Sequence, residues 1–278
     1  MDWTGSYSSS FRVSRVDPRT WEPCGDVANV DEIEVNRDGS DDTPMLETAT
    51  IKVTGDPADP FEPGWLRITM DAVQDGSAES VAIATLWFDS SRGRYDRGYR
   101  DDELDGKSVL WQASGDVKVG DGAWAPKGVN GARWCADALA ALVDAPVHVD
   151  GDGFELAESI VFDLDSSVLA AVWAVLGPNG WMLEIDGRGE IHVREKPTDA
   201  ALVLDRAGSC ILMPGVDYGD GTLTYSREWE PGVVPFSLVR ASLPQHGMDG
   251  MFEVVSQTLA CGKGVTVEET VKAVDDAL

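Results

Sequence analysis

One stretch of fifteen residues, Asn179 to Val193, gathers side chains that could do acid–base or metal chemistry. It reads NGWMLEIDGRGEIHV and contains Glu184, Asp186, Glu190 and His192. Histidine titrates near neutral pH and often binds metals, and carboxylates serve as general acids and bases. The stretch could therefore belong to a catalytic cluster, or only to a β-hairpin that packs on the rest of the protein.

The alternation of the stretch favours the hairpin. WMLEI and EIHVR predict two strands around an Asp186–Gly187–Arg188 turn. A three-residue turn puts the apolar side chains on one face, in the pairs Trp181–Val193 and Leu183–Ile191. The other, wetter face would carry Met182, Glu184, Glu190 and His192. His192 is then expected to point outwards, beside acids that do not converge on a pocket.

Two further stretches match known site motifs only in part. Asp101, Glu103, Asp105 and Gly106 fit the first half of a calcium loop, but Gln112 stands at the twelfth position. We interpret these residues as an acidic hairpin loop. The CGKG stretch at 261–264 lacks the spacing of a phosphate-binding loop and predicts a turn.

The cysteines and histidines are too scattered for a zinc site of the usual spacing. They are Cys24, Cys135, Cys210, Cys261, His148, His192 and His246. We expect reduced and mostly buried thiols, with Cys135 packed in the core from the apolar stripe of a helix. No GxSxG nucleophile motif is present, and 49 Asp and Glu residues offer too many carboxylate pairs to select one. We therefore predict no catalytic residue, no metal ligand and no cofactor, and we identify no binding residue.

The charge of the chain limits its partners. The 278 residues carry 49 acidic against 22 basic side chains, a formal net charge of −27. Such a surface repels nucleic-acid phosphates and anionic lipid headgroups. No apolar run approaches the length that spans a membrane, and the N-terminus lacks the features of a signal peptide. Hydrophobic residues make up 43% of the chain, which is enough for a packed core.

Residues 1–116 read as β structure of the barrel or sandwich type. The predicted strands are FRVSRV (11–16), DEIEV (31–35), LETATIKVTG (46–55), WLRITMDAV (65–73), SVAIATLWFD (80–89) and KSVLWQAS (107–114). Turn-rich stretches separate them, and these hold much of the acid.

Residues 117–198 predict a small α/β module. Asn130 can cap a helix over 131–143, and a second helix is expected from about Asp165 or Ser166. Gly177 ends the second helix and could adopt the left-handed cap. VHVDG and FELAESIVFD between the helices predict short strands, and the hairpin described above follows.

Residues 199–278 return to β structure. The predicted strands are ALVLD, SCILM, GTLTYSREWE, PFSLVRASL and MFEVVSQTLA, and GVTVEETVKAVDDAL is expected to be a strand or a short helix. The fold class is therefore β-rich α+β, in the order β, α/β, β.

This order of segments resembles the baseplate hub, or tail-tip, proteins of long-tailed bacteriophages and prophages. The resemblance covers nearly the whole chain and consists of apolar positions and turns rather than a catalytic signature. It is carried by LETATIKVTGD, EPGWLRITMDA, ESVAIATLWFDSS, SRGRYDRGYRDDELDGKSVLWQAS, NGARWCADALAALV, SSVLAAVWAVLGPNGWMLEIDGRGEIHVREKPT and MDGMFEVVSQTLACGKGVTVEE.

The resemblance implies two tube-like β-barrel domains, at 1–116 and 199–278, with the α/β module at 117–198 between them. It implies a ring of three subunits that joins a hexameric tail tube to the tail tip, in a virion tail made in the bacterial cytoplasm. The implied partners are further copies of the chain, the tail tube and other baseplate or tail-tip proteins. The family carries no catalytic residue in this part. Because the chain ends at Leu278, we expect any spike or lytic domain to be a separate protein.

The acidity suits such a tube, because a wall that does not bind phosphates lets DNA slide through. We expect part of the negative charge to face a central channel; the alternative is that it only keeps the surface soluble. Two other functions remain open: a cell-wall or polysaccharide hydrolase with two carboxylates, and a carbohydrate-binding module built on some of the ten tryptophans. Trp65, Trp87, Trp111, Trp173 and Trp181 lie in apolar stretches, which favours core positions.

Overall fold

The computed structural model describes residues 3, 7–40, 43–55, 61–96, 99–115, 117–120, 124–204, 217–219, 222–243, 248–262 and 264–274. The strand expected at SCILM and the positions of Cys210 and His246 lie outside these residues.

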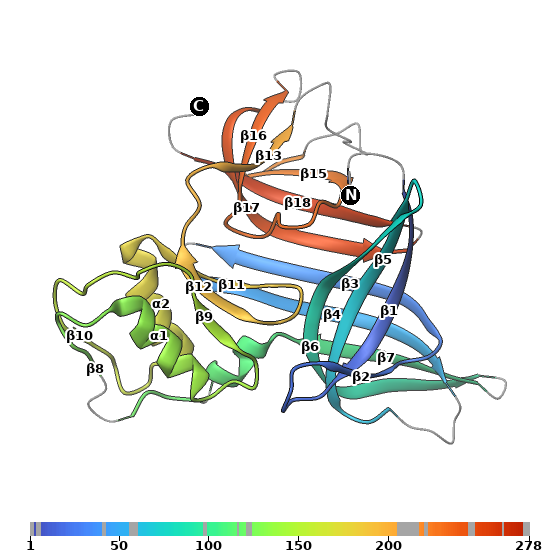
Figure 1. Cartoon of the computed structure of the whole chain (residues 1–278), viewed down its shortest axis with the longest axis horizontal. Coiled ribbons are helices and arrows are strands. Elements are labelled where there is room, and N and C mark those ends of the chain that lie inside the picture. The colour runs from blue at the N-terminus through green and yellow to red at the C-terminus, as the bar shows by residue number, and fades with distance from the viewer. Residues whose placement is uncertain are drawn as a thin grey trace.

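Most of the described chain forms one large sheet (Figure 1). Its strands are β1 (Ser8–Val16), β2 (Pro23–Asp26), β3 (Val30–Ser40), β4 (Thr43–Gly55), β5 (Gly64–Gln74), β6 (Ser77–Asp96), β7 (Tyr99–Lys107), β13 (Ala200–Leu204), β14 (Asp217–Gly219), β15 (Thr222–Glu228), β16 (Leu238–Leu243), β17 (Met248–Cys261) and β18 (Val265–Ala273). The strand order is β14-β15-β18-β17-β3-β4-β7-β6-β5-β1-β2, and β16 links β13 to β17.

Strand β17 joins the two β-rich ends of the chain. Its second half pairs with β3, from Ser256 opposite Asp38 to Cys261 opposite Ile33, and its first half pairs with β16. The predicted first and third segments therefore share one continuous hydrogen-bonded sheet. Among the described strands no barrel closes: the structure is β-rich α+β, as expected, but two separate barrels are not seen.

The alternating patterns predicted most of these strands, and two misassignments have clear causes. Most of the expected strand KSVLWQAS is instead the 3-10 helix η1 (Val109–Ala113). This helix buries Val109, Leu110 and Ala113 in the core. The acids at 101–105 lie within strand β7 and not in a loop. Asp101, Glu103 and Asp105 are tolerated there because they share the face of the strand that meets solvent, whereas Asp102 is buried on the other face, so composition alone gave the wrong prediction. The C-terminal stretch is the strand β18.

The α/β module lies against the large sheet. It contains α1 (Gly131–Ala140), α2 (Val168–Leu176), the 3-10 turn η2 (Gly177–Asn179), and the short strands β8 (Trp124–Ala125), β9 (Val147–Val149), β10 (Ile160–Val161), β11 (Trp181–Ile185) and β12 (Ile191–Glu195). Strands β11, β12 and β9 form a small sheet, with β9 parallel to β12. Both helices contact this sheet, and β11 also contacts β4 of the large sheet (Figure 1).

The helix ends follow the capping chemistry with some changes. The Asn130 side chain accepts a hydrogen bond from the Arg133 amide, as predicted, and Ser167 caps α2 in the same way through the Ala170 amide. Helix α1 ends at Ala140, before the predicted 143. Gly177 is right-handed and continues into η2, so the left-handed glycine is Gly180 instead, with φ 72°. Among the residues that the structure describes, no helix is both long and apolar enough to cross a membrane.

Candidate functional site

The hairpin singled out by its chemistry forms, with a register two residues away from the predicted one. Leu183 pairs with Val193 and Ile185 with Ile191, so the tip comprises residues 186–190. The prediction assumed a three-residue turn. The longer tip is closed by Asp186, whose carboxylate accepts from the Glu190 amide at 2.8 Å and whose carbonyl accepts from the Gly189 amide at 2.8 Å.

A shift of two residues preserves the side-chain faces. The expected apolar face is confirmed: Trp181, Leu183, Ile191 and Val193 are all buried. The opposite face is wet only in part, because β11 lies against β4. Met182 is fully buried, and burial raises the pKa of Glu184 above its ordinary value.

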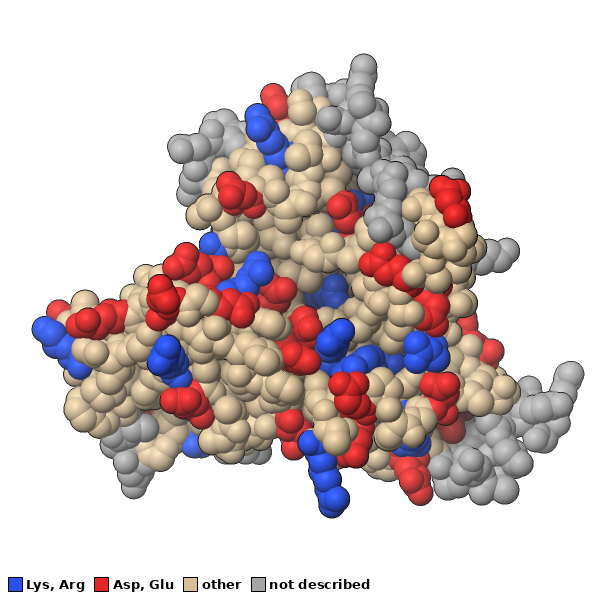
Figure 2. Space-filling model, viewed as in Figure 1, with Lys and Arg blue, Asp and Glu red and all other residues tan. Residues whose placement is uncertain are grey.

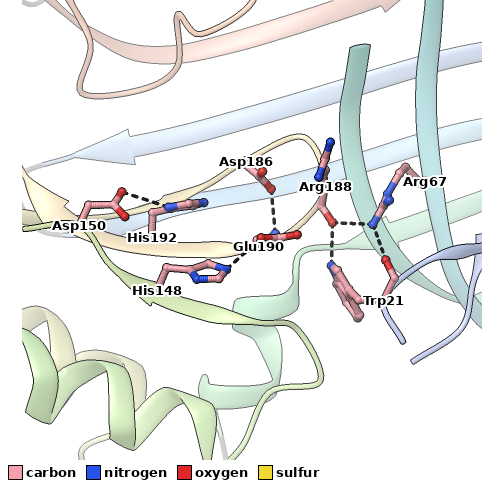
Figure 3. Close-up of polar contacts among 8 residues, drawn as sticks. All are labelled: Trp21, Arg67, His148, Asp150, Asp186, Arg188, Glu190 and His192. Carbon is pink, nitrogen blue, oxygen red and sulfur yellow. Dashed lines mark hydrogen bonds and ion pairs between the residues drawn. The ribbon is translucent and has the colours of Figure 1, made fainter. Parts of the chain in front are cut away.

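The hairpin tip docks on the large sheet through its backbone (Figure 3). The Arg188 carbonyl accepts from the Trp21 indole at 2.8 Å and from the Arg67 guanidinium at 3.1 Å. The Thr85 hydroxyl donates to the Gly187 carbonyl at 3.1 Å. A Cβ on Gly187 would lie 1.9 Å from the Ala82 carbonyl oxygen, so only glycine allows this approach. We call these contacts the tip junction.

Beside the tip, two histidines and three carboxylates come together, which the sequence did not predict (Figure 3). His148 and His192 are direct partners on β9 and β12, with ring centroids 5.1 Å apart. His148 Nε2 lies 2.9 Å from Glu190, and His192 Nδ1 lies 3.0 Å from Asp150. One potential ligand atom from each of Asp186, Glu190 and His192 lies within 4.8 Å of the other two. The expectation that the acids near His192 do not converge is therefore wrong.

Charged residues gather where the module meets the large sheet. Figure 2 shows acidic and basic side chains in a band across the middle of this view, over the hairpin and the neighbouring strands. Within the hairpin, Arg194 of β12 lies 3.0 Å from Glu184 of β11. Glu47 of β4 is fully buried close by, and burial raises its pKa to about 7 although the Arg37 guanidinium opposes the rise.

A row of buried polar side chains crosses the sheet at the β3–β17 junction. In register across five strands these are Glu47, Arg37, Gln257, Glu269 and Tyr225, and all are at least 97% buried. Glu269 accepts from the Tyr225 hydroxyl and the Gln257 amide, each at 2.7 Å, and from the Arg227 guanidinium at 2.9 Å. Arg37 donates to Glu47 at 2.7 Å. We call this set the polar row.

On the opposite side of the sheet, the face formed by β3, β4 and the neighbouring β7 is acidic and open to solvent. We define this acidic face by Glu32, Glu34, Asp38, Asp101, Glu103 and Asp105. Lys52 stands between Glu32 and Glu103 and pairs with Glu32, whose carboxylate raises the pKa of Lys52. A groove of about 600 Å³ runs across this face between β3, β4, β7 and the β17–β18 turn. The groove therefore spans the seam between the two β-rich ends of the chain.

The other sequence candidates have structural roles. Cys135 is fully buried in α1, and burial raises its thiol pKa far above the ordinary value. In the CGKG stretch, Cys261 ends β17 and Val265 follows as the start of β18, as the predicted turn requires, while Lys263 lies outside the described residues. Of the tryptophans assigned to the core, Trp111 is 43% exposed because η1 replaces the expected strand, and the Lys107 ammonium lies over its indole ring.

No protein-family model matches the sequence, and no curated protein matches it either. Solved structures, in contrast, are similar over nearly its whole length. The 43 kDa tail protein of prophage MuSo2 from Shewanella oneidensis has a TM-score of 0.68 at 12% identity, over 95% of this chain and 96% of that one.

The tail protein from Neisseria meningitidis MC58 has a TM-score of 0.64 at 14% identity, over 97% of both chains. The E. coli c3393 protein, a type VI secretion component with structural similarity to the T4 bacteriophage tail proteins gp27 and gp5, has a TM-score of 0.55 at 9% identity, over 89% of this chain and 74% of that one. The resemblance found in the sequence is thus confirmed at the level of the fold: the chain has the fold of prophage tail proteins.

Proposed function

We propose that this chain is a structural component of a phage or prophage tail, at the baseplate hub that joins the tail tube to the tail tip. The observation that carries the proposal is the fold, which the prophage MuSo2 tail protein and the Neisseria meningitidis tail protein share over 95% or more of this chain. The proposed role is structural and not enzymatic. Among the described residues, the carboxyl groups with raised pKa values are Glu47, which is fully buried, and Glu184, whose side chain is 17% exposed beside β4. A polysaccharide would not reach the two together.

In this proposal, three copies form a ring. Residues 1–116 and 199–278 act as two tube-like domains, and three subunits with two such domains each would match a sixfold tube. The pairing of β17 with β3 supports this arrangement, because it makes one continuous wall from the two ends of the chain. The module at 117–198 would lie beside that wall, and the partners would be the tail tube and other tail-tip proteins.

The assembly is tested by the mass in solution of the 29.9 kDa chain, measured by light scattering across a concentration series. We expect a trimer, or a mass that rises towards a trimer with concentration. Adding purified tail-tube protein should complete the ring if the free chain is partly dissociated. A mass that remains monomeric at every concentration, with and without the tube protein, would contradict the ring.

We further propose that the acidic face lines the channel through which DNA passes without binding. Its carboxylates, on a wall that runs across the β3–β17 seam, would repel phosphates. The test is Thr50→Cys, at a position in the groove, in a background where Cys24 and Cys210 are replaced by serine, so that the buried Cys135 and Cys261 are the native thiols that remain. In the assembled ring a small maleimide should react and a bulky polymer-linked maleimide should not. Equal reaction with both would place this face outside the channel.

A further inference from the structure

We propose that the hairpin tip holds a divalent transition-metal ion, Zn²⁺ in the simplest case, with Asp186, Glu190 and His192 as its ligands. These three side chains bring one potential ligand atom each within 4.8 Å of the others. One imidazole and two carboxylates match the nitrogen and oxygen ligands of zinc, whereas Mg²⁺ and Ca²⁺ prefer oxygen alone. This inference does not rest on the proposed tail function.

The histidine is already oriented as a ligand. His192 Nδ1 lies 3.0 Å from the Asp150 carboxylate, which favours the tautomer with the proton on Nδ1. The other ring nitrogen then has a free lone pair, and Figure 3 shows that edge of the ring directed towards Asp186 and Glu190. A carboxylate behind a ligating histidine is the usual outer partner in zinc sites. Asp150 is therefore a positioning residue.

The carboxylates are also held in place. His148 Nε2 lies 2.9 Å from Glu190, and one oxygen of Asp186 accepts from the Glu190 amide at 2.8 Å, which leaves the other oxygen available. The tip junction fixes the backbone between them, because the carbonyls of Gly187 and Arg188 are bound to the large sheet. A rigid backbone that preorganises ligands lowers the cost of binding.

Neither of the two carboxylates, Asp186 and Glu190, is directly paired with a lysine or arginine of the described chain. Arg194 is close to Glu184 instead. Two neighbouring carboxylates repel each other, and a bound cation relieves that repulsion. With three protein ligands, a tetrahedral ion keeps one position for water. The ion would tie the hairpin tip to β12 and, through Asp150, to the end of β9.

The experiment titrates the untagged, metal-free full chain with ZnCl₂ by calorimetry. We expect one ion per chain, and affinity at least about tenfold weaker in Glu190→Gln and in His192→Gln. Asp163→Asn, an exposed carboxylate of the same module, is the matched control and should bind as the unmodified chain does. Circular dichroism establishes that each variant is folded. Absence of binding by the unmodified chain, or equal binding by His192→Gln, would overturn the proposal.

Two further measurements distinguish a specific metal site from nonspecific binding of the ion to acidic side chains on the surface. Co²⁺ in place of Zn²⁺ should give intense visible absorption, typical of tetrahedral coordination, in the unmodified chain and not in His192→Gln. His148→Gln should weaken binding about tenfold through loss of its contact with Glu190. If excess Mg²⁺ displaces the ion, or if Asp163→Asn weakens binding as much as Glu190→Gln, the ion is adsorbed on surface acids and the proposal is wrong.

Discussion

Two junctions hold the parts of this protein together, and they differ in chemistry. At the β3–β17 junction, a backbone ladder continues from one end of the chain to the other, and the polar row crosses it. At the tip junction, side chains of the large sheet bind neutral carbonyls of the hairpin, and a glycine lets the backbones touch. The first junction buries charge that must remain paired, whereas the second depends on shape.

Glu269 and Glu47 show what burying charge requires. Glu269 accepts hydrogen bonds from three side chains, Tyr225, Arg227 and Gln257, on its two oxygens. Glu47 is bound by Arg37 through one oxygen, and its other oxygen has no hydrogen-bond partner among the residues that the structure describes. Asp186 and Glu184 add negative charge near Glu47, which therefore stands where the two junctions meet. This difference predicts that the loss of the Glu269 charge strongly lowers the free energy of unfolding, and that titration of Glu47 makes the free energy of unfolding depend on pH.

The largest expected effect on stability comes from replacing Glu269. Glu269→Gln removes the charge that compensates the buried Arg227 guanidinium, and we expect the free energy of unfolding to fall by about 3–5 kcal/mol. Urea unfolding followed by tryptophan fluorescence measures the change. Glu268→Gln, its exposed neighbour on β18, should stay within about 0.5 kcal/mol of the unmodified chain. Equal losses in the two variants would remove the special role given to Glu269.

The next effect is a pH dependence at Glu47. Its pKa rises from an ordinary 4.5 to about 7 on folding, so the folded chain holds this proton more tightly than the unfolded chain does. Its contribution to stability is complete below the unfolded pKa and is lost as pH rises through the folded pKa. At about 1.4 kcal/mol per pKa unit, the loss amounts to about 3 kcal/mol.

Urea unfolding at several pH values between about 5 and 8 tests this dependence. The unmodified chain should lose stability across the range relative to Glu47→Gln, which cannot titrate. Glu34→Gln, on the exposed face of the neighbouring strand, should follow the unmodified chain. Parallel curves for the unmodified chain and Glu47→Gln would show that Glu47 does not titrate as proposed.

The smallest of the three effects is expected at the tip junction, where the close approach of two backbones matters more than charge. Gly187→Ala would put a Cβ 1.9 Å from the Ala82 carbonyl, and overpacking of this kind costs about 1–3 kcal/mol. Hydrogen exchange should become faster in the hairpin tip and stay unchanged in the β3–β17 ladder. Gly25→Ala, with no atom within 4 Å of the added carbon, is the control. Faster exchange in both junctions would mean that they are not independent.

The alternating patterns were sufficient for most strands, both helices and the β, α/β, β order, because side-chain period and capping are local properties. They failed where local signals competed. The apolar residues of η1 looked like a strand, and the acids of β7 looked like a loop. The division of the hairpin side chains between two faces was predicted correctly, although the second face is partly buried against β4. The register was not predicted, because a hydrogen bond from Glu190 to Asp186 decided the length of the tip.

The sequence by itself determined the class of the fold, the large negative charge and the resemblance to tail proteins. Only the tertiary structure decided that the two β-rich ends share one sheet, because strand pairing between residues more than two hundred positions apart leaves no local signal. It also decided that His192 meets Asp186, Glu190 and Asp150, since two of these contacts depend on the register of the tip and the third on a parallel strand from elsewhere in the module.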